Sequence, residues 1–178
     1  EHWEAQHGAA ALQAVVSQGQ YRHADGLFYG GQAPTWSQQT LRTVLRQHAQ
    51  RARRIGWIDL HTGLGPSGVG ERICACRDDA ASLQRARNWW GSGGQTPVTS
   101  IYDGSSTSAR LTGLMWNAAY EECPQAEYTG IALEYGTKPF PEVLLALRAD
   151  HWLHRHPEAP EAQAQAIRQQ TRDAFYVD

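Results

Sequence analysis

The run at residues 55–61, "IGWIDLH", constrains the fold most, because it is short, almost continuously apolar and rich in residues that favour strands. A run of this kind is typical of a central strand that is covered on both faces. It directly follows a stretch with helical spacing, and helical and strand-like stretches alternate after it. This alternation predicts an α/β fold, with a mixed, mostly parallel sheet flanked by helices.

Three more strands are expected, at residues 72–76, 99–103 and 128–135. Helices are expected at residues 1–18, 78–90, 139–154 and 159–175, and the last two have proline near their start, where a helix tolerates it. A Gly/Ser-rich connector occupies residues 91–95. We expect a single domain over residues 1–178, although two smaller halves are compatible with this length.

The helix before the first strand is expected to begin at a cap on Ser37. Its apolar stripe recurs at helical spacing, with arginines outside it, as in an amphipathic surface helix. The stripe consists of Leu41, Val44, Leu45, His48 and Ala52. A histidine on such a face is more often a hydrogen-bonded core residue than a ligand, so we expect His48 to lie in the core.

Composition excludes several classes of protein. The net charge of -2 offers no basic field for nucleic acid or an anionic membrane, and no apolar run is long enough to span a bilayer. Cys74, Cys76 and Cys123 are an odd set without C-x-x-C spacing, which argues against a disulfide framework or a structural zinc site. We therefore expect a cytoplasmic protein that binds neither nucleic acid nor membrane.

A glycine motif follows the first strand. Gly63, Gly65 and Gly68 spell G-x-G-x-x-G, the arrangement that cradles a dinucleotide pyrophosphate. That motif must open directly into a helix, whereas here Pro66 interrupts the turn and residues 72–76 read as a strand. Nucleotide binding is therefore the weakest functional hypothesis, and we expect the turn to let the chain leave the sheet sharply.

Two residues at strand ends are stronger candidates. His61 ends the first strand beside this glycine-rich loop, at the sheet edge where α/β enzymes work, and could be a metal ligand or a histidine bonded to a loop carbonyl. Asp59 points to the same face and could hold the second ring N–H of a ligand histidine. Glu134 ends the last apolar run, where desolvation would raise its pKa toward that of a general base, although a glutamate paired with an arginine fits equally well.

His151 and His154 form an H-x-x-H pair in the helix at residues 139–154. They continue an apolar stripe, which favours helix packing over metal binding.

Three stretches taken together resemble a bacterial branch of the zinc carboxypeptidase superfamily, which also contains aspartoacylase and succinylglutamate desuccinylase enzymes. They are "DGLFYGGQAPTWS", "WIDLHTGLGPSGVGERI" and "YDGSSTSARLTGLMWNAAYEECPQAEYTGIALEYGT". The resemblance implies a zinc carboxypeptidase-like fold and a single Zn²⁺, held by an early HxxE motif and by a later histidine that ends a central strand. It implies that His61 is this later ligand and that Glu134 is the general base.

The resemblance implies a zinc-dependent hydrolase that cleaves an amide bond of a peptide or N-acyl amino acid. None of the eight histidines is followed three residues later by glutamate, so the chain resembles the C-terminal half of such an enzyme, with an incomplete zinc site. The opening of the chain on a helical pattern without a cap agrees with this. We expect a missing N-terminal half or self-association to complete the fold, and a non-catalytic binding module remains the alternative.

Overall fold

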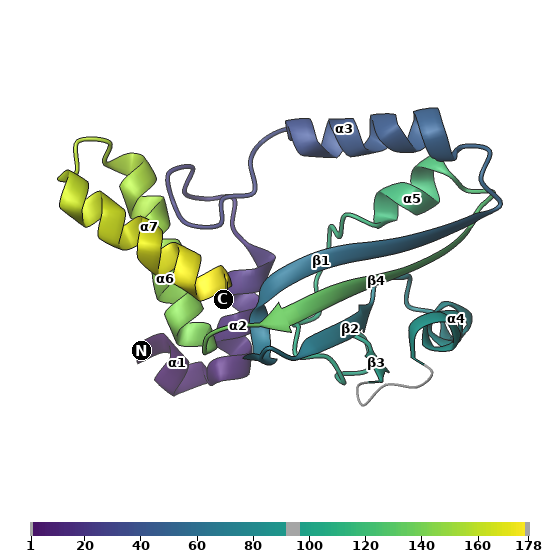
Figure 1. The fold of residues 1–178 in the computed structure, drawn as a ribbon, viewed down its shortest axis with the longest axis horizontal. Helices are drawn as coiled ribbons and strands as arrows, with labels where there is room; N and C mark the ends of the chain where they lie inside the picture. The colour runs from purple at the N-terminus through teal and green to yellow at the C-terminus, as the bar shows by residue number, and fades with distance from the viewer. Residues whose placement is uncertain (1, 92–96, 177–178) are drawn as a thin grey trace. The chain divides into compact units, whose positions relative to one another are not determined.

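The computed structural model describes residues 2–91 and 97–176 (Figure 1). The helices are α1 (His2–His7), α2 (Ala9–Gln18), α3 (Trp36–Val44), a π-helical turn η1 (Leu45–Ala49), α4 (Ala80–Trp90), α5 (Asn117–Glu122), α6 (Phe140–Arg155) and α7 (Glu161–Phe175). The strands are β1 (Arg54–Ser67), β2 (Gly70–Cys74), β3 (Val98–Thr99) and β4 (Glu127–Gly136). These elements confirm the α/β fold, whereas residues 92–95 of the predicted connector lie outside the described residues.

The chain divides into two compact units. Unit 1 consists of Glu1–Asp59 and Arg72–Ala132, and unit 2 consists of Leu60–Glu71 and Leu133–Asp178. The boundaries fall within β1, β2 and β4, so these strands contribute residues to both units. The single domain expected over residues 1–178 stays a prediction.

The four strands form one sheet in the order β1-β4-β2-β3 (Figure 1). β1 and β4 run in the same direction, because hydrogen bonds join the residues at their starts and also those at their ends. β2 runs opposite to β4, and β2 and β3 are parallel, with Arg72 opposite Val98. The sheet is therefore mixed, as predicted.

The position of β1 differs from the prediction. β1 is an edge strand in this order, and its burial alternates along the strand instead of being continuous. Ile58 is 54% exposed and Leu60 is 74% exposed, so one face of the strand is open. The expectation of a central strand covered on both faces was wrong because apolar character does not reveal whether neighbouring elements are present to cover it. β4 is the strand with a continuously buried run.

Unit 1 has a hydrophobic core of large side chains. Trp57, Tyr120 and Tyr128 pack edge to face, with ring centroids 6.1 Å apart for Trp57 and Tyr128 and 4.9 Å apart for the two tyrosines. The buried residues of this core are Ile73, Cys74, Ala75, Cys76, Ala86, Val98, Ile101, Trp116, Ala119, Tyr128 and Ile131. The predicted elements β2, β4 and α4 each contribute residues to this core.

The residue that caps the N-terminus of α3 is not the predicted one. Thr35 has an extended backbone, and its hydroxyl accepts a hydrogen bond from the Gln38 N–H at 3.2 Å. Ser37 lies inside the first turn instead. Thr35 and Ser37 both carry a hydroxyl group and lie two positions apart. Because the backbone of Thr35 is extended, as a capping residue requires, Thr35 caps the helix.

The π-helical turn changes which side chains are buried. Such a turn takes more residues than an α-helical turn, so it displaces the following side chains around the helix axis. Leu45 is buried, whereas Val44 is 47% exposed and His48 is exposed. The prediction that His48 lies in the core was therefore wrong.

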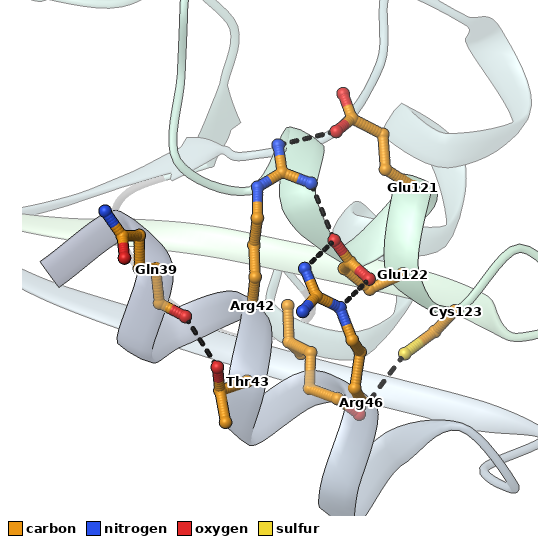
Figure 2. Close-up of polar contacts among 8 residues, drawn as sticks. Gln39, Arg42, Thr43, Arg46, Glu121, Glu122 and Cys123 are labelled. Atoms are coloured by element: carbon orange, nitrogen blue, oxygen red, sulfur yellow. Dashed lines mark hydrogen bonds and ion pairs between the residues drawn. The ribbon is translucent and has the colours of Figure 1, made fainter. Parts of the chain in front are cut away.

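Ion pairs join α3 and η1 to α5 (Figure 2). Arg42 contacts Glu121 Oε2 at 2.6 Å and Glu122 Oε1 at 2.8 Å, and Arg46 Nε contacts Glu122 Oε2 at 2.7 Å. The hydrogen bonds from Arg46 and then Arg42 lower the pKa of Glu122 to about 2. This network attaches the amphipathic helix to the remainder of unit 1.

In unit 2, α6 and α7 pack side by side (Figure 1). Their buried side chains are Val143, Ala146, Ala164 and Ala174, which are small. His151 is half-buried on the predicted stripe, but the His154 side chain is 78% exposed and lies 3.5 Å from Asp150. The packing interpretation thus holds for His151 and was wrong for His154. Among the helices that the structure describes, none is long and apolar enough to cross a membrane.

Candidate functional site

His61 and Glu134 lie together on the neighbouring strands β1 and β4, within unit 2. His61 Nδ1 is 3.7 Å from Glu134 Oε2. The His61 side chain is 47% exposed and that of Glu134 is 11% exposed. The structure therefore brings together the two residues that the sequence singled out, one within reach of solvent and the other largely withdrawn from it.

The two oxygens of the Glu134 carboxylate have different surroundings. Oε1 accepts a hydrogen bond from the Leu64 N–H at 3.2 Å, and Oε2 faces the imidazole of His61. The N–H restrains the carboxylate, while burial withdraws it from bulk water. A carboxylate held in this way can exchange a proton with a group bound next to His61.

A close approach of backbones holds the ends of β1 and β4 beside this pair. The Gly68 N–H donates to the Gly136 carbonyl at 2.9 Å, and a side chain at Gly136 would collide with the carbonyls of Gly65 and Pro66. Only glycine fits at position 136. Since Gly136 lies two residues after Glu134, this contact sets the position of the strand end that carries the carboxylate.

The glycine motif forms a turn between two strands. The Val69 N–H donates to the Pro66 carbonyl at 3.1 Å, and Gly68 has a φ of 72°, as the third residue of a type II turn requires. The turn leads directly from β1 into β2, with no helix after it. The glycines therefore do not form the helix N-terminus on which phosphate binding depends.

The end of α7 also supports the β1 segment around His61. The Thr62 hydroxyl donates to the Phe175 carbonyl at 2.8 Å. The Phe175 ring lies against Gly63, where a Cβ would come within 2.8 Å of it. These contacts join residues far apart in the sequence, so no local signal could have revealed them.

The residues of this chain fit only part of a zinc site. A catalytic zinc usually has three protein ligands, for which a neutral histidine is well suited. Within residues 2–91 and 97–176, no group of three or more histidine, cysteine, aspartate or glutamate side chains is arranged to hold a metal ion. His61 and Glu134 fit the roles of one ligand and a base, and the role given to Asp59 stays a prediction.

A groove in unit 1 does not include the His61–Glu134 pair. It has a volume of about 410 Å³ and lies between α3 and α5 with the segment before α5. Its wall combines Leu41, Leu114 and Met115 with the charged Arg42 and Glu121. The His61–Glu134 pair lies in unit 2, so the pair and this groove belong to different units.

Comparison with known families places the chain in a family. The model of the family described as "Protein of unknown function (DUF2817)" matches residues 1–178. The chain belongs to this family. No curated protein and no solved structure matches the chain. The family covers the whole candidate site but assigns no activity to it.

Proposed function

We propose that this DUF2817 chain forms one side of the active site of a zinc-dependent hydrolase that cleaves an amide bond of a peptide or N-acyl amino acid. The observation that carries the proposal is the 3.7 Å approach of His61 Nδ1 to the buried carboxylate of Glu134 at the ends of adjacent strands. The resemblance of the surrounding motifs to the zinc carboxypeptidase superfamily supports the same assignment.

The two residues have distinct roles in this proposal. His61, as neutral imidazole, is a metal ligand. Zinc, when bound, polarises a carbonyl and lowers the pKa of a water molecule. Glu134 takes a proton from the attacking water and passes it to the leaving amine, while the Leu64 N–H keeps one carboxylate oxygen in place.

The remaining ligands come from a polypeptide segment outside these 178 residues or from a second copy of the chain. The edge position of β1 supports this part of the proposal, because an edge strand can pair with a further strand. Ile58 and Leu60 expose apolar surface on the same strand, which such a partner would cover. We expect the isolated chain to bind zinc weakly and to self-associate.

Metal content after dialysis and mass in solution by light scattering test the incomplete site. Weak zinc binding together with self-association is the expected result. A stoichiometric, tightly held zinc in a strict monomer would show that the chain completes the site from its own residues.

The roles of His61 and Glu134 are tested in a polypeptide that combines this chain with an HxxE segment. Glu134→Gln should lower hydrolysis by about 10²-fold or more while zinc stays bound, because the base contacts the water and not the metal. His61→Ala should lose both zinc and activity. Glu127→Gln on the same strand and His48→Ala, both exposed, are matched controls. Full activity of Glu134→Gln would contradict the assignment.

The alternative is a non-catalytic binding module on the same scaffold. The incomplete set of ligands among the described residues favours it. If the combined polypeptide binds no zinc and Glu134→Gln has no effect on any amide hydrolysis, this alternative replaces the first proposal.

A further inference from the structure

The C-terminal end of α7 is hydrogen-bonded close to both members of the candidate catalytic pair (Figure 1). The Thr137 hydroxyl, in the residue that follows β4, donates to the Ala174 carbonyl at 2.5 Å. The Thr62 hydroxyl in β1 donates to the carbonyl of the next helical residue, Phe175, at 2.8 Å. One helix end therefore accepts a hydrogen bond from each of the two chain segments that carry the pair, and all of these residues lie in unit 2.

The two carbonyls need donors from outside the helix. The last four carbonyls of an α-helix have no partner within it. In α7, the Arg172 carbonyl accepts a hydrogen bond from the Tyr176 N–H at 2.8 Å. Ala174 and Thr137 are both buried, so the threonine supplies the donor that bulk water cannot. The helix end thus holds the threonine hydroxyls in place as much as they satisfy the helix end.

Three consecutive residues of β1 connect this helix end to the pair. Thr62, which directly follows His61, is hydrogen-bonded to α7. Gly63 is buried, and a Cβ on it would come within 2.8 Å of the Phe175 ring. The Leu64 N–H donates to the carboxylate of the candidate base at 3.2 Å. The segment that carries the imidazole and restrains the carboxylate is therefore fixed to α7 through a hydroxyl and a ring.

The end of β4 is fixed to the same helix. Thr137 lies three residues after Glu134 and directly after Gly136, whose carbonyl accepts a hydrogen bond from the Gly68 N–H. A displacement of Thr137 would therefore move the strand end that carries the carboxylate. His61 Nδ1 and Glu134 Oε2 are 3.7 Å apart, and a displacement of about 1 Å between groups that act together can lower a reaction rate greatly.

We propose that Thr62 and Thr137 are positioning residues, which set the approach of the His61 imidazole to the Glu134 carboxylate through the C-terminal end of α7. Each threonine acts through its own strand and does not itself bind metal or substrate. Their effect on hydrolysis rests on the proposed function, whereas the placement of the pair can be measured without zinc or substrate.

NMR of the chain with isotope-labelled histidine rings tests the placement. The signal of the His61 ring is assigned by its absence in His61→Ala. Glu134→Gln should shift this signal, because it removes a charge 3.7 Å from Nδ1. In a chain that also carries Thr62→Val and Thr137→Val, we expect the shift caused by Glu134→Gln to fall by about half or more at the same pH.

Thr171→Val is the matched control. Its hydroxyl also donates to a carbonyl, that of Ile167 at 3.0 Å, but both residues belong to α7. This variant should leave the effect of Glu134→Gln on the His61 signal unchanged.

Thr62→Ser and Thr137→Ser keep the hydroxyl and should retain the full effect of Glu134→Gln on the His61 signal. A full effect in the double valine variant would overturn the proposal, whatever loss of Tm the valines cause, because the threonines would then only stabilise the fold. Each single valine variant is measured as well, so that the test does not depend on the stability of the double variant. A full effect in both single variants would equally overturn the proposal.

The effect on catalysis is measured in the polypeptide that combines this chain with an HxxE segment. The valine variants should lower kcat by about tenfold or more, with KM and zinc content little changed, because the pair is displaced while the ligand residues remain. An unchanged kcat would overturn the catalytic role of the threonines. If the unmodified combined polypeptide hydrolyses no amide, the proposed function fails, and the His61 signal still decides whether the threonines position the pair.

Discussion

The two units bury different kinds of side chain. Unit 1 buries large apolar and aromatic residues such as Ile131, Trp116 and Tyr128, whereas the buried residues of unit 2 are small or polar, including Glu134 and Thr137. Apolar burial therefore stabilises unit 1, and close backbone approaches with hydrogen bonds contribute more to unit 2. The candidate catalytic pair lies in the unit with the smaller apolar core, which suggests that its polar groups are held by specific contacts and not by bulk packing.

The largest expected effect comes from a substitution that would create a cavity in the core of unit 1. Ile131 is 2% exposed, and Ile131→Ala should lower the free energy of unfolding by about 2–5 kcal/mol, because it removes buried methyl groups and leaves space behind. Urea denaturation measures this loss. Leu145→Ala in unit 2, where the side chain is 54% exposed, should change stability by about 0.5 kcal/mol or less. Equal losses in the two variants would contradict the comparison.

The next effect concerns backbone packing in unit 2. Gly136→Ala places a Cβ against the carbonyls of Gly65 and Pro66, which no side-chain rotation relieves, so we expect a loss of about 1–3 kcal/mol. Hydrogen exchange should show increased opening at the Gly68 amide. Gly56→Ala in β1 is the matched control, since its nearest neighbour would be at an ordinary contact distance of 3.4 Å. An unchanged Gly68 amide in Gly136→Ala would show that this contact is not needed.

A smaller effect distinguishes the observed helix cap from the predicted one. Thr35→Ala should destabilise the chain by about 1 kcal/mol, because the Gln38 N–H loses its acceptor. Ser37→Ala should change stability by only a few tenths of a kcal/mol, as it removes no cap. Thermal unfolding of both variants tests this prediction. A larger loss of stability for Ser37→Ala than for Thr35→Ala would indicate that Ser37 is the cap, as the sequence predicted.

The smallest effect is pH-dependent. The folded pKa of Glu122 is depressed from 4.5 to about 2, so its ion pairs stabilise the fold above the ordinary pKa and are lost as the pH falls through the depressed value. Glu122→Gln should therefore lower the Tm at neutral pH, and the difference from the unmodified chain should shrink between about pH 5 and pH 2. Glu127→Gln, which removes a single ion pair of 3.7 Å, is the control. A difference that does not depend on pH would rule out the ion pairs as its cause.

Much of the secondary structure was predictable from local patterns. The helices α4, α6 and α7 and the strands β2 and β4 lie where helical spacing, strand-like runs and prolines place them. The short helix α5 was missed, since "NAAYEE" at residues 117–122 is too brief for a periodic signal. Gly8 divides the predicted opening helix into α1 and α2. The strand predicted at residues 99–103 is observed as the two-residue strand β3 (Val98–Thr99).

The candidate site was predictable only in part. His61 and Glu134 were found because polar residues at the ends of apolar runs stand out in a sequence. Their 3.7 Å approach, the Leu64 N–H and the support of Phe175 depend on strand pairing and on contacts between distant residues.

The sequence by itself determined the α/β class, the positions of most elements and the residue types available for chemistry, because these depend on local periodicity and composition. Only the tertiary structure decided that β1 is an edge strand and that Thr35 and not Ser37 caps α3. It also decided that His48, which lies in a π-helical turn, is exposed and not in the core. Strand order, capping geometry and burial depend on which distant segments pack against a residue, and this information is not contained in the spacing of its neighbours.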